Sequence, residues 1–154
     1  MKLKDYMIIS ILALIFLITF ILIQVTQKKA GDLALVYVAG VKVIEVDFSK
    51  NKYELFEQEN HEEYPKSSIN EDSNVEVIIL GEYQLNGKRT EVVIEISFEK
   101  QAIRIKKDST PKQIGVNRNW YDGKGLPVVS LPNLVYIKFE KEITDGVDAE
   151  IWKT

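Results

Sequence analysis

The chain contains no cysteine and only one histidine, His61, among its 154 residues. Without cysteine it cannot form a disulfide, an iron–sulfur cluster, a thiolate zinc site or a cysteine nucleophile. A single histidine excludes polyhistidine metal sites and most catalytic triads. The sequence therefore predicts a protein with no catalytic residue, no metal site and no cofactor of its own.

An excess of basic residues is also lacking. The chain has 20 basic and 23 acidic residues, and residues 1–25 hold Lys2, Lys4 and Asp5, so the remainder carries a net charge of −4. Nonspecific binding of nucleic acid requires a basic surface. We therefore expect no nucleic-acid partner.

Residues 7–25 form an uncharged and almost wholly apolar run. At about 1.5 Å per residue a helix of this length spans roughly 28 Å, close to the roughly 30 Å thickness of a bilayer's hydrocarbon core. A signal peptide has a shorter apolar region, followed by a small-residue cleavage site. The run here ends in Gln24 and polar residues without such a site. The sequence therefore favours an uncleaved transmembrane anchor over a signal peptide.

The orientation of this anchor follows from the charges that flank it. Lys2 and Lys4 precede the run, and Lys28 and Lys29 follow it, so the side chains are balanced. The free amino group at the start adds a positive charge and favours an N-terminus inside the cell. We expect a cytoplasmic tail (residues 1–6), a linker (residues 26–32) and an extracytoplasmic domain on a single-pass protein of the cell membrane.

Strand-like sequence dominates the rest of the chain, and no stretch after residue 25 has the pattern of an amphipathic helix. Gly40 and the Asn86-Gly87 pair are typical of tight hairpin turns. Ile103 and Ile105 alternate with polar residues, which indicates a sheet with one solvated face. The class is all-β, a small barrel or sandwich of about seven or eight strands behind one N-terminal transmembrane helix. The expected strands are 33–39, 41–48, 53–57, 75–80, 91–98, 102–106 and 134–139, within a domain of residues 33–141 that precedes a tail of residues 142–154.

The segment from residue 58 to residue 74 loses its apolar periodicity. It lies in an acidic region that contains Lys66 as its one basic residue. The spacing of the acids matches no calcium-binding loop, so a solvated acidic loop with an exposed His61 is the favoured interpretation. A docking site for a basic partner, or for the chain's own basic residues, stays open. The acids are Glu54, Glu57, Glu59, Glu62, Glu63, Glu71 and Asp72.

Residues 108–133 contain three blocks of residues at characteristic spacing, namely Ser109, Pro111, Ile114, Val116 and Trp120, then Gly125, then Val128, Val129, Leu131, Pro132 and Asn133. Together with the strands on either side, this pattern resembles the NusG domain II family. The resemblance extends over residues 33–140, with residues 58–74 as an insertion. It implies a β fold. Where the family has cysteines, this chain has Thr110, Gly115 and Ser130, and these residues cannot cycle redox state or bind a metal as thiols do.

The resemblance also implies a function. Anchored, stand-alone members of the family are similar to small envelope proteins of Gram-positive bacteria, some encoded with flavin-linked extracellular electron-transfer components. This implies a non-catalytic β domain that binds or helps assemble envelope components, with an envelope protein as its partner. The alternative is an accessory subunit of flavin-based electron transfer that binds flavin or a flavinylated partner through Trp120, Arg118 and Lys112.

Basic and aromatic residues gather in one stretch of the sequence and form the candidate interaction surface. Trp120 has a second interpretation, in which it closes one end of the barrel while the basic groups solvate the outer face. Ser130 is predicted to be packed or hydrogen-bonded to backbone, rather than a hydrolase nucleophile, because no base accompanies it. The candidate surface consists of Arg104, Lys106, Lys112, Arg118, Trp120, Tyr121 and Lys124.

Overall fold

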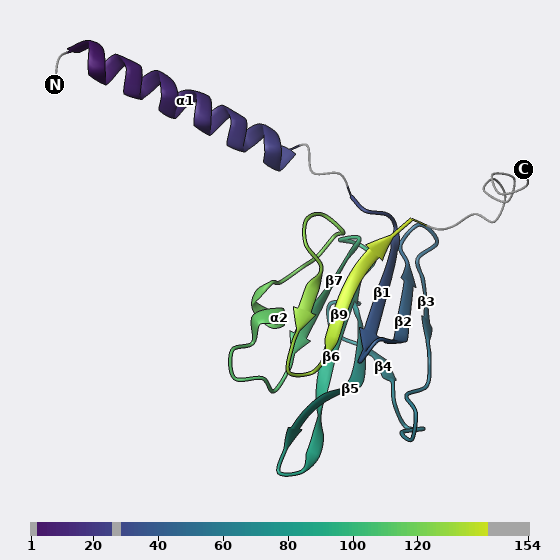
Figure 1. Cartoon of the computed structure of the whole chain (residues 1–154). Helices are drawn as coiled ribbons and strands as arrows, with labels where there is room; N and C mark the ends of the chain where they lie inside the picture. The colour runs from purple at the N-terminus through teal and green to yellow at the C-terminus, as the bar shows by residue number, and fades with distance from the viewer. Residues whose placement is uncertain (1–2, 26–28, 142–154) are drawn as a thin grey trace, which may run out of the picture.

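The computed structural model of the protein describes residues 3–25 and 29–141, and the predicted tail of residues 142–154 lies outside them (Figure 1). The first element is α1 (Leu3–Val25), whose side chains are all exposed from Lys4 to Ile23. Among the described residues, α1 is the one helix that is long and apolar enough to cross a membrane. It ends where the predicted anchor ends, at Val25.

Five antiparallel strands form the first sheet, in the order β3-β2-β1-β9-β8 (Figure 1). Ala39 and Gly40 close its first hairpin with φ values of 49° and 84°. Two successive positive φ values are typical of a type I′ turn, whose twist matches that of the flanking strands. The predicted hairpin is therefore confirmed. The strands are β1 (Leu33–Val38), β2 (Val41–Asp47), β3 (Lys52–Leu55), β8 (Val128–Ser130) and β9 (Val135–Glu140).

The second sheet has four antiparallel strands in the order β4-β5-β6-β7. The predicted turn at Asn86-Gly87 is confirmed, with φ values of 53° and 75°. On the last strand Ile103 and Ile105 are fully buried while Arg104 and Lys106 point outward, as the alternation predicts. The strands are β4 (Lys66–Ile69), β5 (Val75–Leu85), β6 (Lys88–Ser97) and β7 (Ala102–Lys107).

Buried residues of both sheets form one apolar core, in which Phe48, Ile44, Ile79 and Ile94 are among the largest side chains. The all-β prediction is confirmed as a sandwich, with nine strands in residues 29–141 where about seven or eight were expected. The two strands missed are β4 and β8, and both are short strands at the edge of a sheet. An edge strand has few core-facing positions, so its sequence carries little alternation.

The structure corrects the prediction of a solvated loop over residues 58–74. Lys66–Ile69 form β4 and pair with β5. Gln58 is buried, and its side chain makes two hydrogen bonds with the backbone of Leu80, donating from Nε2 at 2.9 Å and accepting at Oε1 at 2.8 Å. Because these bonds satisfy a buried amide, they hold the start of the segment of residues 58–74 against β5.

Candidate functional site

The structure separates the residues of the candidate interaction surface. Tyr121 lies in the core, where its ring packs edge-on against Phe139 with 5.2 Å between centroids. Burial raises the pKa of its phenol, partly opposed by the charge of Arg118. Trp120, the preceding residue, is half-buried, and its ring lies 4.5 Å from the Arg104 guanidinium carbon. Tyr121 therefore supports the fold, and Trp120 is the aromatic residue that remains near the surface.

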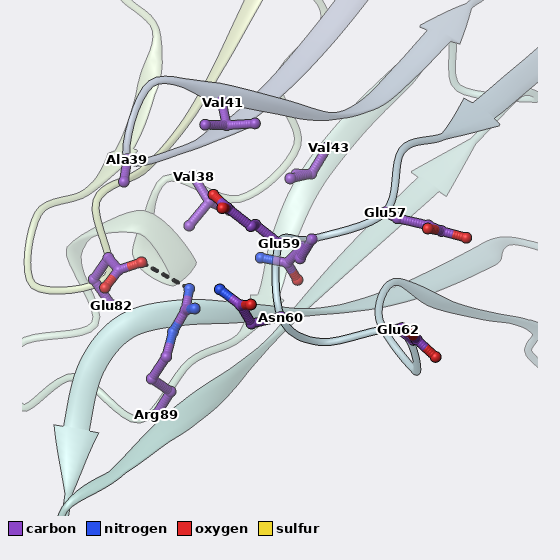
Figure 2. Close-up of a pocket in the computed structure, with 11 residues that line it drawn as sticks. Val38, Ala39, Val41, Val43, Glu57, Glu59, Asn60, Glu62, Glu82 and Arg89 are labelled. Carbon is purple, nitrogen blue, oxygen red and sulfur yellow. Dashed lines mark ion pairs between the residues drawn. The ribbon is translucent and has the colours of Figure 1, made fainter.

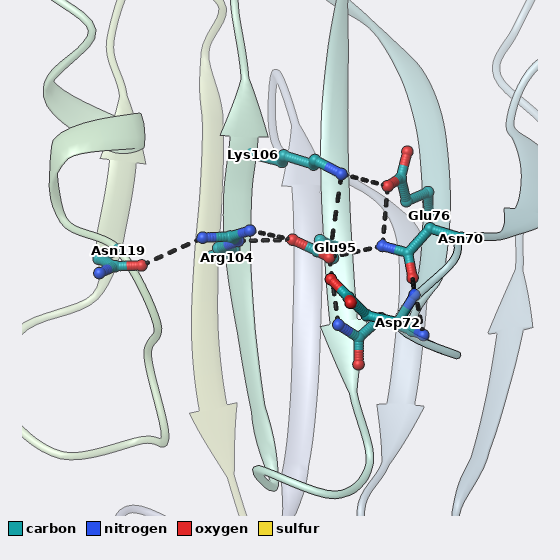
Figure 3. A network of polar contacts seen from close by, with 8 residues as sticks. Asn70, Asp72, Glu76, Glu95, Arg104, Lys106 and Asn119 are labelled. Carbon is teal, nitrogen blue, oxygen red and sulfur yellow. Dashed lines mark hydrogen bonds and ion pairs between the residues drawn. The ribbon is translucent and has the colours of Figure 1, made fainter.

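Arg104 and Lys106 belong to a polar network on the outer face of the second sheet (Figure 3). Its centre is Glu95 on β6, whose side chain is 1% exposed. Arg104 Nε donates to Glu95 Oε2 at 2.6 Å, and Asn70 Nδ2 donates to Oε1 at 2.7 Å. Lys106 pairs with Glu76. Both basic side chains are thus neutralised by acids of the same sheet, Arg104 by Glu95 on β6 and Lys106 by Glu76 on β5.

The same network explains the ionisation of its carboxylates. Burial alone raises the pKa of Glu95, but hydrogen bonds from Arg104, Asn74 and Asn70 outweigh it and hold the pKa below its ordinary value. The hydrogen bond from Lys106 likewise lowers the pKa of Glu76. The ion-pair partners of Arg104 and Lys106 are therefore acids of β5 and β6. The sequence had left open that the acids of residues 54–72 would pair with these basic residues.

The remaining candidates have other neighbours. Arg118 donates to the backbone oxygen of Leu126 at 3.2 Å, and Lys124 pairs with Asp122 at 3.3 Å. Lys112 lines a separate groove. No observation of the structure favours joint binding of flavin by Trp120, Arg118 and Lys112, so that alternative stays a prediction. Titration of the protein with flavin, followed by tryptophan fluorescence, tests it.

A buried polar cluster, missed by the sequence analysis as a site, lies beneath the groove that Lys112 lines. Asp108 is its centre. Its Oδ1 accepts from Thr110 N at 3.0 Å and from Thr110 Oγ1 at 2.7 Å, and its Oδ2 accepts from Ser130 Oγ at 2.9 Å. Asn133 Nδ2 donates to Ser130 Oγ at 3.2 Å. The short D-x-T spacing at 108–110 is a local signal for the first of these bonds.

This cluster determines what Ser130 can do. The Ser130 side chain is buried and hydrogen-bonded to Asp108, which is the packed role expected of it, although with a side-chain rather than a backbone partner. A serine nucleophile needs a base that takes its proton. His61 lies in the segment after β3, where its backbone bonds to Gln58 and Tyr64. The described residues therefore give Ser130 no histidine base.

The groove above the cluster has a volume of about 560 Å³ and lies between α2 (Ile114–Asn117) and β8. Its walls are mostly apolar and strongly exposed, with Ile114 at 61% and Leu131 at 68%. A Cβ at Gly115 would lie 2.7 Å from Ile105 Cδ1 on β7 and 3.3 Å from the Val129 carbonyl oxygen, so glycine lets α2 approach both β7 and β8 closely. The lining residues are Thr110, Pro111, Lys112, Ile114, Val129, Ser130, Leu131 and Pro132.

A second cavity, of about 650 Å³, lies at the end of the sandwich where β1 and β2 meet (Figure 2). Apolar residues of the hairpin, including Val38 and Val43, form part of its wall. Its acidic residues are Glu57, Glu59, Glu62 and Glu82. The one basic residue among those that line it, Arg89, pairs with Glu82 at 2.7 Å. The cavity wall is therefore net negative.

The two depressions are parts of one continuous surface. A shallow depression of about 320 Å³ shares Val129 and Leu131 with the groove and Ala39 with the acidic cavity. Lys112 lies at the groove end of this surface and the glutamates lie at the other end. We call this the binding surface; it consists of the groove, the shallow depression and the acidic cavity. Among the described residues, no group of three or more His, Asp or Glu has the arrangement of a metal site.

Fold and surface together define an antiparallel β-sandwich domain behind one apolar N-terminal helix. The sequence profile of NusG domain II matches residues 7–142, and the chain belongs to this family. The structure of the Lin0431 protein from Listeria innocua is similar at 20% identity and a TM-score of 0.46, covering 71% of this chain and 95% of that one. A DUF1312 family protein (EF3258) from Enterococcus faecalis is similar at 17% identity and a TM-score of 0.39, covering 71% of this chain and 97% of that one. No curated protein matches the sequence significantly.

Proposed function

We propose that this protein is a membrane-anchored, extracytoplasmic and non-catalytic β domain that binds another protein of the cell envelope. The observation that carries the proposal is the exposed apolar groove beside β8. Exposed apolar patches on small domains mark sites of protein interaction. The groove has a rigid base, because the buried hydrogen bonds around Asp108 hold β8 and the segment before α2 in place.

The anchor is supported by α1 itself. Its apolar side chains from Met7 to Ile23 are exposed, so in water this helix would expose a large apolar surface to solvent, which is unfavourable. The hydroxyl of Thr19 donates to the Ile15 carbonyl at 2.8 Å, which satisfies this polar group without water inside a bilayer. An N-terminus inside the cell then puts the sandwich outside.

The charge along the binding surface defines the segment of the partner. Lys112 at the groove end favours an acidic residue, the apolar middle favours aliphatic side chains, and Glu57, Glu59 and Glu62 at the cavity end favour basic residues. The occupant is therefore an extended segment of a partner protein that is acidic at one end, apolar in the middle and basic at the other.

Photo-crosslinking in intact cells tests this proposal. A benzophenone amino acid at Leu131 is expected to give one discrete adduct with a second protein. The cross-linked peptide, sequenced by mass spectrometry, is expected to contain an apolar stretch next to a basic one. Ile114→Asp in the same chain is expected to abolish the adduct, because it puts a charge into the apolar wall.

Ile69 provides the matched control. It is an exposed isoleucine, at 74%, on β4 of the other sheet. Ile69→Asp is expected to leave the Leu131 adduct unchanged, and a benzophenone at Ile69 itself is expected to give none of it. Equal adducts from the two positions, or an adduct that Ile114→Asp leaves intact, would refute the groove as the docking site.

A further inference from the structure

We propose that the end of the sandwich that carries Lys29 and Gly123 rests on the lipid headgroups of the membrane that α1 crosses. The inference rests on the proposed function in one respect, which is that α1 is an uncleaved anchor. It adds a second interaction surface, with the bilayer as its partner, on a different part of the domain from the groove.

The chain is attached to the sandwich from Lys29 onward. The Lys29 ammonium lies 5.4 Å from the Phe139 ring centroid and pairs with Asp32 at 2.9 Å. Ala30 N donates to the Gly123 carbonyl at 3.0 Å. Gly31 fits so closely against β9 that a Cβ would lie 1.9 Å from the Glu140 carbonyl oxygen. The chain from Lys29 onward is therefore held by contacts with the sandwich and cannot lengthen the tether to α1.

The distance that the remaining chain can cover is short. Four residue steps separate Val25, where α1 ends, from Lys29. A fully extended chain covers at most about 3.6 Å per residue, so these steps reach about 14 Å. The headgroup region is about 5–8 Å thick on each side of the hydrocarbon core. Because the fully extended tether exceeds this thickness by about 6–9 Å, the Lys29 end lies within the headgroups or no more than about 9 Å above them.

The charges at this end do not select a lipid. A cavity of about 370 Å³ here is lined by Lys29, Lys141, Asp32 and Asp47, whose charges cancel. Basic clusters are what draw proteins to anionic lipids. Contact at this end is therefore imposed by the short tether, and it does not depend on the charge of the lipid.

This arrangement fixes the height of the groove above the membrane. Ser130 pairs with Val135, five residues along β9 from Glu140. At about 3.3 Å per residue the groove lies about 17 Å from the membrane-facing end. The segment that occupies it must therefore belong to the membrane-proximal part of its protein.

Energy transfer from dyes on the domain to acceptor-labelled headgroups tests the proposal in the full chain, reconstituted into phosphatidylcholine vesicles. The chain has no cysteine, so Lys124→Cys and Lys88→Cys each create a single labelling site. Lys124 is next to Gly123, and Lys88 follows the turn at the far end of β5 and β6. The two ends of the 11-residue strand β5 are about 33 Å apart. We therefore expect the energy transfer from a dye at position 124 to be about twofold or more that from a dye at position 88. Equal transfer from both sites would overturn the proposal.

A lengthened tether is the matched control. About twenty Gly and Ser residues inserted after Val25 give a flexible linker with an end-to-end distance of about 25 Å. The difference in energy transfer between the two dye positions is expected to disappear in the chain with the lengthened tether. In the chain with the original tether it is expected to persist at high salt. A difference that survives the insertion, or that requires anionic lipid, would contradict a tether-imposed contact. Alkaline extraction separates the two claims, because release of the chain from the vesicles would refute the anchor itself.

Discussion

Replacing Asp108 by alanine is expected to destabilise the sandwich more than any other single change in the cluster beneath the groove. The carboxylate is 2% exposed and accepts three hydrogen bonds, two from Thr110 and one from Ser130. A buried donor left without its acceptor costs about 1–3 kcal/mol. Three such donors, with partial relief from rotation of the two hydroxyls, give an expected loss of about 3–5 kcal/mol in the free energy of unfolding.

Two milder variants separate the contributions. Asp108→Asn keeps the acceptor for both Thr110 bonds but puts an NH₂ group opposite the Ser130 hydroxyl, so we expect a loss of about 1–2 kcal/mol. Ser130→Ala removes one donor to Asp108 and the acceptor of Asn133, for a loss of about 1–3 kcal/mol.

Urea unfolding of the full chain in detergent, followed by tryptophan fluorescence, measures these differences. The expected order of destabilisation is Asp108→Ala above both other variants. A loss below about 1 kcal/mol for Asp108→Ala, or equal losses for alanine and asparagine at this position, would refute the argument that three hydrogen bonds to the carboxylate hold the cluster together.

Three further outcomes follow from the contacts described above. A hydrogen bond from the Ser49 side chain is the largest of the interactions that lower the pKa of Asp47 from 3.8 to about 2, so the ionised carboxylate stabilises the fold above pH 3.8 and this stabilisation is lost as the pH falls through 2. Asp47→Asn is therefore expected to lower the free energy of unfolding by about 2 kcal/mol at pH 7 and to flatten its fall between pH 4 and pH 2, as measured by urea unfolding at each pH. Glu95→Gln removes the charge that pairs with Arg104 and is expected to lower stability by about 2–4 kcal/mol, whereas an unchanged urea midpoint would contradict a buried ion pair. The double variant Gly115→Cys with Ser130→Cys is expected to form a disulfide under mild oxidation, because the separation of 3.4 Å between the two Cβ positions is close to the range of about 3.5–4.5 Å that a disulfide requires. Thiols that still react fully with maleimide after oxidation would show that α2 and β8 do not meet as described.

Local signals in the sequence were enough to predict the hairpins and the solvated face of β7. Gly40 and Asn86-Gly87 define turns by their backbone freedom, and the alternation at Ile103 and Ile105 depends on nothing outside its own strand. The edge strands β4 and β8 were not predicted, because each has only three or four residues and all four residues of β4 are exposed.

The structure does not gather the residues of the candidate surface on one face, for a related reason. Trp120 and Tyr121 are neighbours in the sequence, but Tyr121 exchanges two backbone hydrogen bonds with Ile103 and so extends the sheet. Successive side chains of an extended segment point to opposite faces, which puts Tyr121 in the core and leaves Trp120 near Arg104. Proximity in sequence therefore does not put these two side chains on one face.

The groove illustrates what a single sequence does not contain. Ile114 and Leu131 were noted only as matches to the family pattern, and no local pattern indicated that they form two walls of one groove. Asp108 reaches Ser130 across 22 residues, and such a contact depends on how the strands are arranged. The positions that replace the family's cysteines, Thr110, Gly115 and Ser130, also lie together at this groove.

The side of the membrane on which the sandwich lies tests the account most directly, because an envelope partner requires the domain to be outside the cell. Lys88→Cys puts a single exposed thiol at the end of the sandwich far from Lys29, in a chain that has no other cysteine. Labelling of intact cells with a membrane-impermeant maleimide is expected to modify this thiol fully. Labelling that occurs only after the cells are lysed, with the chain intact and in the membrane fraction, would place the sandwich in the cytoplasm and contradict the account.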